Sequence, residues 1–150
     1  MIGMDILKPV VALLGWTMLM WVWMYATRIP AINKLPKEGG PDADVGWTGA
    51  KLDGLIAPNI QWKAHNYNHL HEAPTLFYAI AITLALMGMG DGINYWLAWG
   101  YVGFRIVHSI VQATVNIVAY RFTLFALATA CLIGLTVHAG LKILHDCGVI

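Results

Sequence analysis

The chain has 150 residues, of which 59% are apolar and only 11% are charged, and its mean hydropathy is +0.63. This composition is typical of a protein whose main solvent is the lipid bilayer. The formal net charge is +1, and no basic block interleaved with aromatic residues is present, so nucleic acid is not an expected partner. The two cysteines, Cys131 and Cys147, form neither a CxxC motif nor a disulfide framework.

Four apolar stretches predict membrane-spanning helices, at residues 6–27, 58–88, 95–119 and 122–145. A helix that crosses about 30 Å of hydrocarbon needs roughly 20 residues at 1.5 Å per residue. The turn between the second and third stretches, GMGDGIN, is short, so these two helices are expected to be antiparallel neighbours. The predicted fold class is therefore all-α, with residues 1–150 forming a single transmembrane domain, an integral four-helix membrane bundle.

A polar connection, residues 29–57, is predicted between the first two spans. The first span is expected to end at Arg28 and Pro30, because proline has no backbone N–H and disfavours helix in the residue before it. Within the second span, Pro74 is expected to produce a kink that neighbouring helices or water would tolerate.

The segment HNYNHLHEAPTLFY, residues 65–78, places a polar cluster at the start of the second span. On a continuous helix His65, His69 and Glu72 share one face, and Asn68 and His71 lie beside it. Ionisable side chains at membrane depth are costly and usually mark a functional site. We therefore expect this face to point into the bundle.

The third span carries a second polar stripe. The stripe contains Arg105, His108, Gln112 and Asn116, which are three, four and four residues apart. Ser109 lies next to His108 and belongs to the same stripe. This stripe cannot face lipid. The fourth span is rich in alanine and glycine, which allow helices to pack closely in a membrane.

The distribution of basic residues predicts the orientation. Cytoplasmic loops of membrane proteins carry an excess of Lys and Arg. On one side, the first loop is flanked by Arg28, Lys34, Lys37, Lys51 and Lys63, and the third loop contains Arg121. The other side has only Lys8 and Lys142. The first and third loops are therefore expected in the cytoplasm and both termini outside it, in a bacterial inner membrane. The two polar features then meet at the cytoplasmic side.

The segments NYNHLHEAPTLFY and WGYVGFRIVHSIVQATVNIVAYRF resemble the MAPEG family, membrane-associated proteins in eicosanoid and glutathione metabolism that include microsomal glutathione transferases. This resemblance implies a homotrimer of four-helix subunits, with glutathione as co-substrate bound between neighbouring subunits near the cytoplasmic face. It further implies a transferase or peroxidase acting on lipophilic small molecules that arrive from the bilayer.

The family's site residues correspond to particular positions of this chain. Glu72 matches the carboxylate of the second span, Arg105 and His108 match the R-x-x-H of the third, and Arg121 matches the arginine that stabilises the glutathione thiolate. Arg28 resembles the cation that closes the first span. The resemblance thus predicts Arg121 as catalytic, no metal ligand, and a binding set of Arg28, Asn68, His69, Glu72, Arg105, His108 and Gln112.

Three positions depart from the family's pattern. His69 stands where several relatives have asparagine, and Gln112 and Phe125 stand where glutathione-using relatives often present tyrosines. A non-catalytic accessory membrane subunit is therefore an alternative function. Glutathione binding separates it from the transferase.

The chemistry expected of Arg121 is electrostatic. A cation next to a thiol favours the thiolate, which is the nucleophile. Glu72 suits the amino group of glutathione, and Arg28 or Arg105 suits a carboxylate through a planar two-donor fork.

Structural roles remain as alternatives for the same residues. Arg121 could be a cation that extends to the membrane interface. Arg105 and Glu72 could form an ion pair between the second and third spans. The spacing of His65, His69 and Glu72 also resembles that of metal ligands.

Overall fold

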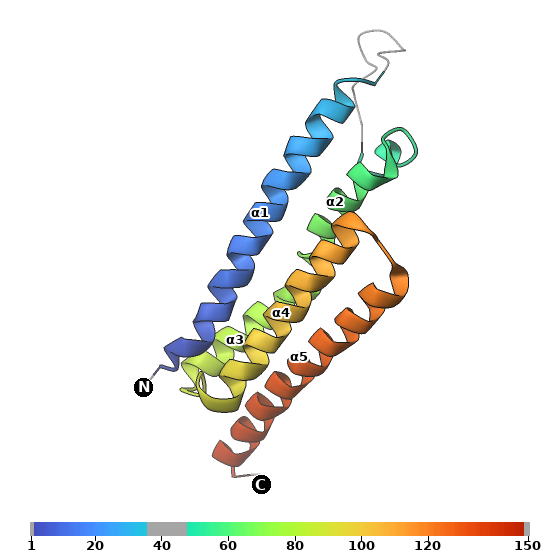
Figure 1. Cartoon of the computed structure of the whole chain (residues 1–150). Coiled ribbons are helices and arrows are strands. Elements are labelled where there is room, and N and C mark those ends of the chain that lie inside the picture. The colour runs from blue at the N-terminus through green and yellow to red at the C-terminus, as the bar shows by residue number, and fades with distance from the viewer. Residues whose placement is uncertain (1, 36–47, 149–150) are drawn as a thin grey trace.

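The computed structural model describes residues 2–35 and 48–148, and all elements of regular secondary structure in this part of the chain are helices (Figure 1). Its elements are η1 Met4–Ile6, α1 Leu7–Ile32, η2 Ala50–Leu52, α2 Pro58–His69, α3 Ala73–Leu86, α4 Gly92–Thr114 and α5 Val118–Asp146. The all-α prediction is confirmed. The predicted loop 29–57 is only partly described, since 36–47 lie outside the described residues.

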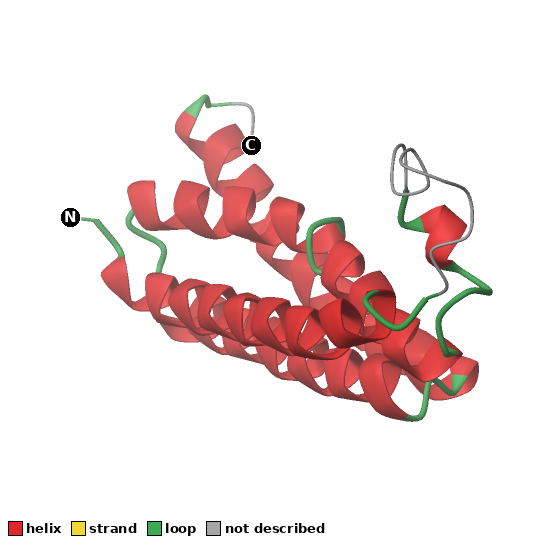
Figure 2. Ribbon diagram, turned by 90° about the horizontal axis from the view of Figure 1, so that it is seen from above, coloured by secondary structure: helices red, strands yellow, loops and turns green. Residues whose placement is uncertain are grey.

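The helix axes are roughly aligned with one another, and the helices form an elongated bundle (Figures 1 and 2). α2 and α3 follow each other nearly end to end and together occupy the place of one long helix (Figure 1). The ends of α1 and α4 and the starts of α2 and α5 lie at one end of the bundle, and both termini lie at the other (Figure 1). α4 makes its most extensive contacts with α5. The polar residues of the second and third predicted spans are thereby brought to the same end.

The predicted second span, 58–88, is not one continuous helix. α2 ends at His69, and α3 begins at Ala73 with Pro74 as its second residue. In a continuous helix Pro74 would lack the N–H that bonds the carbonyl of Leu70, and its ring would clash with that carbonyl. Helix α3 therefore starts anew, which leaves Glu72 as its N-cap residue. The expected common face of His65, His69 and Glu72 does not form.

Two other helix ends differ from the predictions. α1 continues past Arg28 and Pro30 to Ile32, because a proline in the last turn costs only one hydrogen bond while the ladder continues, as Asn33 N–H to Ile29 O at 3.0 Å shows. α4 ends at Thr114, several residues before the expected 119. Asn116 follows with a φ of 52°, the left-handed conformation that asparagine tolerates at helix ends.

Packing is tightest where small residues allow helices to approach. A Cβ on Gly100 would lie 3.3 Å from the sulfur of Cys131, and one on Gly134 would lie 3.1 Å from Leu97. These contacts join α4 to α5, as is common between membrane helices. In the core between α3 and α4, the rings of Phe77 and Tyr101 stack with centroids 4.4 Å apart.

The outer surface of the single chain is strongly apolar. Trp96, Phe122 and Leu86 are each at least 70% exposed, which suits lipid or a neighbouring subunit rather than water. Two stretches, Met4–Ile32 and Val118–Asp146, are long and apolar enough to cross a membrane by themselves. The four-span arrangement stays a prediction.

Candidate functional site

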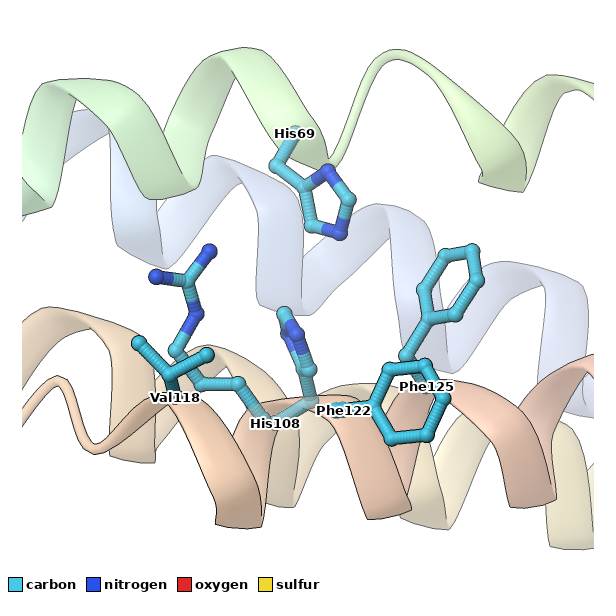
Figure 3. A pocket seen from close by; sticks show the side chains of 6 residues that line it. His69, His108, Val118, Phe122 and Phe125 are labelled. Atoms are coloured by element: carbon cyan, nitrogen blue, oxygen red, sulfur yellow. The ribbon is translucent and has the colours of Figure 1, made fainter.

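A hollow of about 320 Å³ opens between α2, α4 and α5 at the polar end of the bundle. We call it the Arg121 pocket. It is lined by His69, His108, Val118, Arg121, Phe122 and Phe125 (Figure 3). His69 reaches into it from α2, His108 rises toward His69 from α4, and the two phenylalanine rings of α5 lie to one side (Figure 3). The centroids of the two histidine rings are 5.0 Å apart.

Arg121 stands in the first turn of α5 and is held by the turn before it. Its Nη1 donates to Oδ1 of Asn116 at 2.8 Å. Asn116 is itself fixed, because its N–H bonds the carbonyl of Val111 at 2.7 Å and closes the end of α4. Asn116 is therefore not part of a helical stripe, as the sequence pattern predicted, but a turn residue that orients Arg121.

The electrostatics around Arg121 favour an anion. A helix N-terminus is a region of positive potential, where a cation is normally unfavourable and an anion is stabilised. Arg121 adds a full positive charge at this point. Its Nε is buried and has no hydrogen-bond partner within the described part of the chain. An anionic ligand in the Arg121 pocket would satisfy both features.

His69 lies between Glu72 and Arg105. Its Nδ1 is 2.9 Å from Oε2 of Glu72, and its Nε2 is 3.3 Å from Nη1 of Arg105. Arginine can only donate, so Nε2 accepts and Nδ1 carries the hydrogen that is donated to Glu72. The His69 ring thus accepts a hydrogen bond from Arg105 and donates one to Glu72. Arg105 and Glu72 do not form the direct ion pair that was one of the interpretations of the sequence.

Arg105 is the most deeply buried cation of the described residues, at 1% exposure. Its Nε donates to the Tyr101 hydroxyl at 3.2 Å, and its guanidinium lies 5.4 Å from the ring centroid of Phe125. Its Nη2 is buried without a partner in this part of the chain. Aromatic rings therefore lie against much of the charge, and the N–H groups of Nη2 remain without a partner in the described structure.

A buried polar junction next to the pocket serves packing. The Ser109 hydroxyl accepts from Trp16 Nε1 at 3.0 Å and from Asn66 Nδ2 at 2.8 Å, which joins α1, α2 and α4. Sequence reasoning missed Asn66, although its polarity inside an expected span was a usable signal. Gln112 is buried at 4% exposure and does not line the Arg121 pocket.

Arg28 and Asn68 lie elsewhere. They line a second hollow, of about 250 Å³, which we call the Arg28 pocket; its walls are Arg28, Gly49, Ala50, Asp53, Gln61, Ala64, His65 and Asn68. Asn68 and His69 are successive residues of α2 and therefore point into different hollows. Within one subunit, two of the predicted site residues line this hollow and three line the Arg121 pocket, whereas Glu72, Arg105 and Gln112 line neither. Sequence reasoning identified neither Asp53 nor Gln61.

His65 is engaged by the loop before α2. Its Nε2 is 3.1 Å from Oδ1 of Asp53, so it does not converge with His69 and Glu72. No group of three or more potential metal-ligating side chains gathers within residues 2–35 and 48–148.

An elongated helical bundle with long apolar helices and a cationic pocket at its polar end is an arrangement typical of helical membrane proteins. The chain belongs to the MAPEG family, which matches residues 6–141 of the 150. The resemblance drawn from the sequence is confirmed. The comparisons with curated proteins and with solved structures give no match. MAPEG proteins are membrane proteins of glutathione-related transferase or isomerase type, and the family generally uses glutathione.

Proposed function

We propose that the protein is a membrane-bound, glutathione-dependent transferase or peroxidase that presents the glutathione thiolate to lipophilic electrophiles. One observation carries this proposal. Arg121 lines a pocket at a helix N-terminus, oriented by Asn116, with a buried Nε that lacks a partner among the described residues. A thiolate is the anion that glutathione chemistry requires at such a point.

The chemistry at the sulfur needs little else. A thiol has a pKa of about 8.5, so most of it is protonated at neutral pH. A guanidinium held against the sulfur favours the anion. Arginine does not take the proton, which leaves to water. The exposed ring of Phe122 and the half-buried ring of Phe125 provide an apolar approach for an electrophile dissolved in lipid.

The rest of glutathione has two candidate partners: Arg105, which is buried beside the Arg121 pocket without lining it, and Arg28, which lines the Arg28 pocket. The buried Nη2 of Arg105 and the guanidinium of Arg28 each suit a carboxylate. Because Arg28 and Arg121 open into different hollows of one subunit, a ligand that contacts both is best bound between two subunits. We therefore include a homotrimer in the proposal. The 73% exposure of Val118, in the wall of the Arg121 pocket, supports a neighbour that covers it.

Titration of the purified protein with glutathione, followed by thiolate absorbance near neutral pH, tests binding and activation together. A saturable thiolate signal is expected. The trimer is tested separately by native mass spectrometry in detergent, where only monomers would count against it.

An accessory membrane subunit without catalysis is a second candidate, favoured by Phe125. This ring lies 5.9 Å from that of His69 and 5.4 Å from the Arg105 guanidinium, at a position where a hydroxyl donor would help to hold a thiolate. The same titration decides between the two. Bound glutathione without any thiolate signal, or no binding at all, favours the accessory subunit.

A further inference from the structure

The Arg121 pocket contains bases as well as a cation. Arginine only donates hydrogen bonds, so among the described residues that line the pocket only His69 and His108 can accept a proton. Their ring centroids lie 5.0 Å apart, and histidine is the side chain that most often serves as a general base. A thiol proton released in this pocket therefore meets two imidazoles before it reaches bulk water.

His69 is the imidazole whose orientation is fixed. Its Nδ1 donates to Oε2 of Glu72 at 2.9 Å, which leaves the lone pair of the ring on Nε2. Figure 3 shows the outer nitrogen of this ring pointing away from α2 and into the pocket. The side chain is 22% exposed. The nitrogen that can accept a proton therefore faces the space in which a thiol would bind.

Glu72 distinguishes His69 from His108 as a base. A carboxylate that accepts from one imidazole nitrogen holds the tautomer, and it stabilises the imidazolium that forms when the other nitrogen gains a proton. Within residues 2–35 and 48–148, the histidines that lie within ion-pair distance of a carboxylate are His65, His69 and His145. His108 has no such partner there. A thiol, His69 and Glu72 would thus follow the order of nucleophile, imidazole and carboxylate found in catalytic triads.

Two arginines decide when His69 can gain a charge. Nη1 of Arg105 lies 3.3 Å from Nε2, and Arg121 lines the same pocket. An imidazolium beside two guanidinium groups is unfavourable unless an anion is close to it, and a thiolate supplies that anion. The Arg105 contact is longer than most hydrogen bonds, and the thiol S–H takes its place on Nε2. Protonation of His69 is therefore expected together with thiolate binding and not before it.

We infer that His69, oriented by Glu72, accepts the thiol proton of glutathione when the thiol enters the Arg121 pocket. The S–H bond breaks, its electron pair stays on the sulfur, and an N–H bond forms at Nε2. The bound state is a thiolate beside an imidazolium and Arg121. When conjugation consumes the thiolate, the imidazolium returns the proton to the product anion or to water. The inference rests on the proposed function, to which it adds His69 as a catalytic residue and Glu72 as a positioning residue.

The first experiment counts protons. The full-length protein in detergent is mixed with glutathione in dilute buffer near neutral pH, and thiolate absorbance is followed together with a pH-indicator dye. Wild type should form thiolate and release almost no proton, because His69 retains it. His69→Gln has an amide that cannot take the proton, so it should release one proton for each thiolate formed.

His71→Gln is the matched control. His71 is exposed and lies two residues away, but its Nδ1 bonds the carbonyl of Tyr67 at 2.9 Å and it does not line the Arg121 pocket. This variant should keep the wild-type proton count. Glu72→Gln is the second variant if His69→Gln does not fold. It keeps an oxygen that accepts from His69 but loses the charge that stabilises the imidazolium, so it should release more protons per thiolate than wild type.

The second experiment separates a base from a structural side chain by chemical rescue. His69→Ala should lower the rate of conjugation at neutral pH about a hundredfold, the lower end of the effect of a positioned general base. Imidazole added to the solution should restore part of this rate, in proportion to its unprotonated form. His108→Ala should gain nothing from imidazole.

Thiolate without proton release in wild type, together with rescue of His69→Ala, supports the inference. Wild type that releases one proton for each thiolate overturns it and leaves the proposed function standing. Rescue of His108→Ala instead of His69→Ala also overturns it, because His108 is then the acceptor. If wild type gives no thiolate signal with glutathione, the proposed function fails, and the inference fails with it.

Discussion

Nη1 of Arg105 lies 3.3 Å from Nε2 of His69, and the other ring nitrogen of His69 is 2.9 Å from Glu72. A buried cation on α4 is therefore connected through one neutral imidazole to a carboxylate at the start of α3. His69 ends α2 and Glu72 is the N-cap residue of α3, so the two side chains meet at the break between these helices. His69 thus couples two residues that do not touch.

Glu72→Ala should lower the free energy of unfolding by about 0.5–1 kcal/mol, because the carboxylate is largely exposed and its contact is screened. Glu72→Gln should retain most of the stability, since its amide oxygen still accepts from His69. The coupling between Glu72 and Arg105 in a double-mutant cycle, measured by thermal unfolding in detergent, should disappear in a His69→Leu background. A coupling that persists there would show that the two residues interact without the imidazole.

Ser109→Ala should destabilise the bundle by about 1–3 kcal/mol, because it leaves Trp16 Nε1 and Asn66 Nδ2 without their shared acceptor. The measurement is the midpoint of thermal unfolding. Thr136→Ala is the matched control, since its hydroxyl bonds only the carbonyl of Leu132 within α5, and it should change the stability by less than about 0.5 kcal/mol. Equal losses in the two variants would show that Ser109 joins no helices.

Gly90→Ala should be destabilising by about 1–3 kcal/mol, because a Cβ there would overlap the backbone of Gly3. Both partners are backbone atoms, and Gly3 is further held by its N–H bond to Ala85 O at 2.8 Å. Gly15→Ala, on a helix with nothing within 4 Å of the added carbon, should be neutral or stabilising by up to about 1 kcal/mol. Unfolding midpoints that move together in the two variants would contradict this packing.

The helices themselves were predictable, because apolar runs between Pro, Gly and charged residues are strong local signals. Their ends were less so. Pro74 indicated a kink, yet whether a proline bends a helix or starts a new one depends on what surrounds the freed carbonyl. Pro30, in contrast, does not end its helix, because a proline in the last turn of α1 removes only one backbone hydrogen bond. Asn116 fitted a helical interval by coincidence, because interval counting cannot detect a residue in the left-handed conformation.

The candidate site was predictable in its residue types more than in its grouping. Sequence reasoning singled out His69, His108 and Arg121, and the structure brings them to one pocket. It also included Arg28 and Asn68, which lie in another. Adjacent residues on a helix differ in direction by about 100°, so a list of polar residues does not say which of them share a cavity. Asp53 lies in a loop, where no periodic pattern marks a site.

Arg121→Ala tests the chemistry of the proposed function at one side chain. A charge-assisted contact of about 1.5–3 kcal/mol on the sulfur corresponds to roughly one to two pKa units of the bound thiol. Removing it should raise that pKa, lower the rate at neutral pH about tenfold to a hundredfold, and allow part of the rate to return at higher pH, where more thiolate forms without help. The measurement is the pH profile of conjugation together with thiolate absorbance.

Two further variants separate charge from position. Arg121→Lys keeps a cation without the fork and should retain part of the activity. Asn116→Gly preserves the left-handed turn, which glycine adopts freely, but removes the oxygen that holds Nη1 at 2.8 Å. It should therefore reduce the rate less than Arg121→Ala and leave folding intact. If Arg121→Ala keeps the wild-type rate and pH profile while Arg105→Ala loses both, the thiolate lies against α4, and the buried Nη2 of Arg105 is its partner.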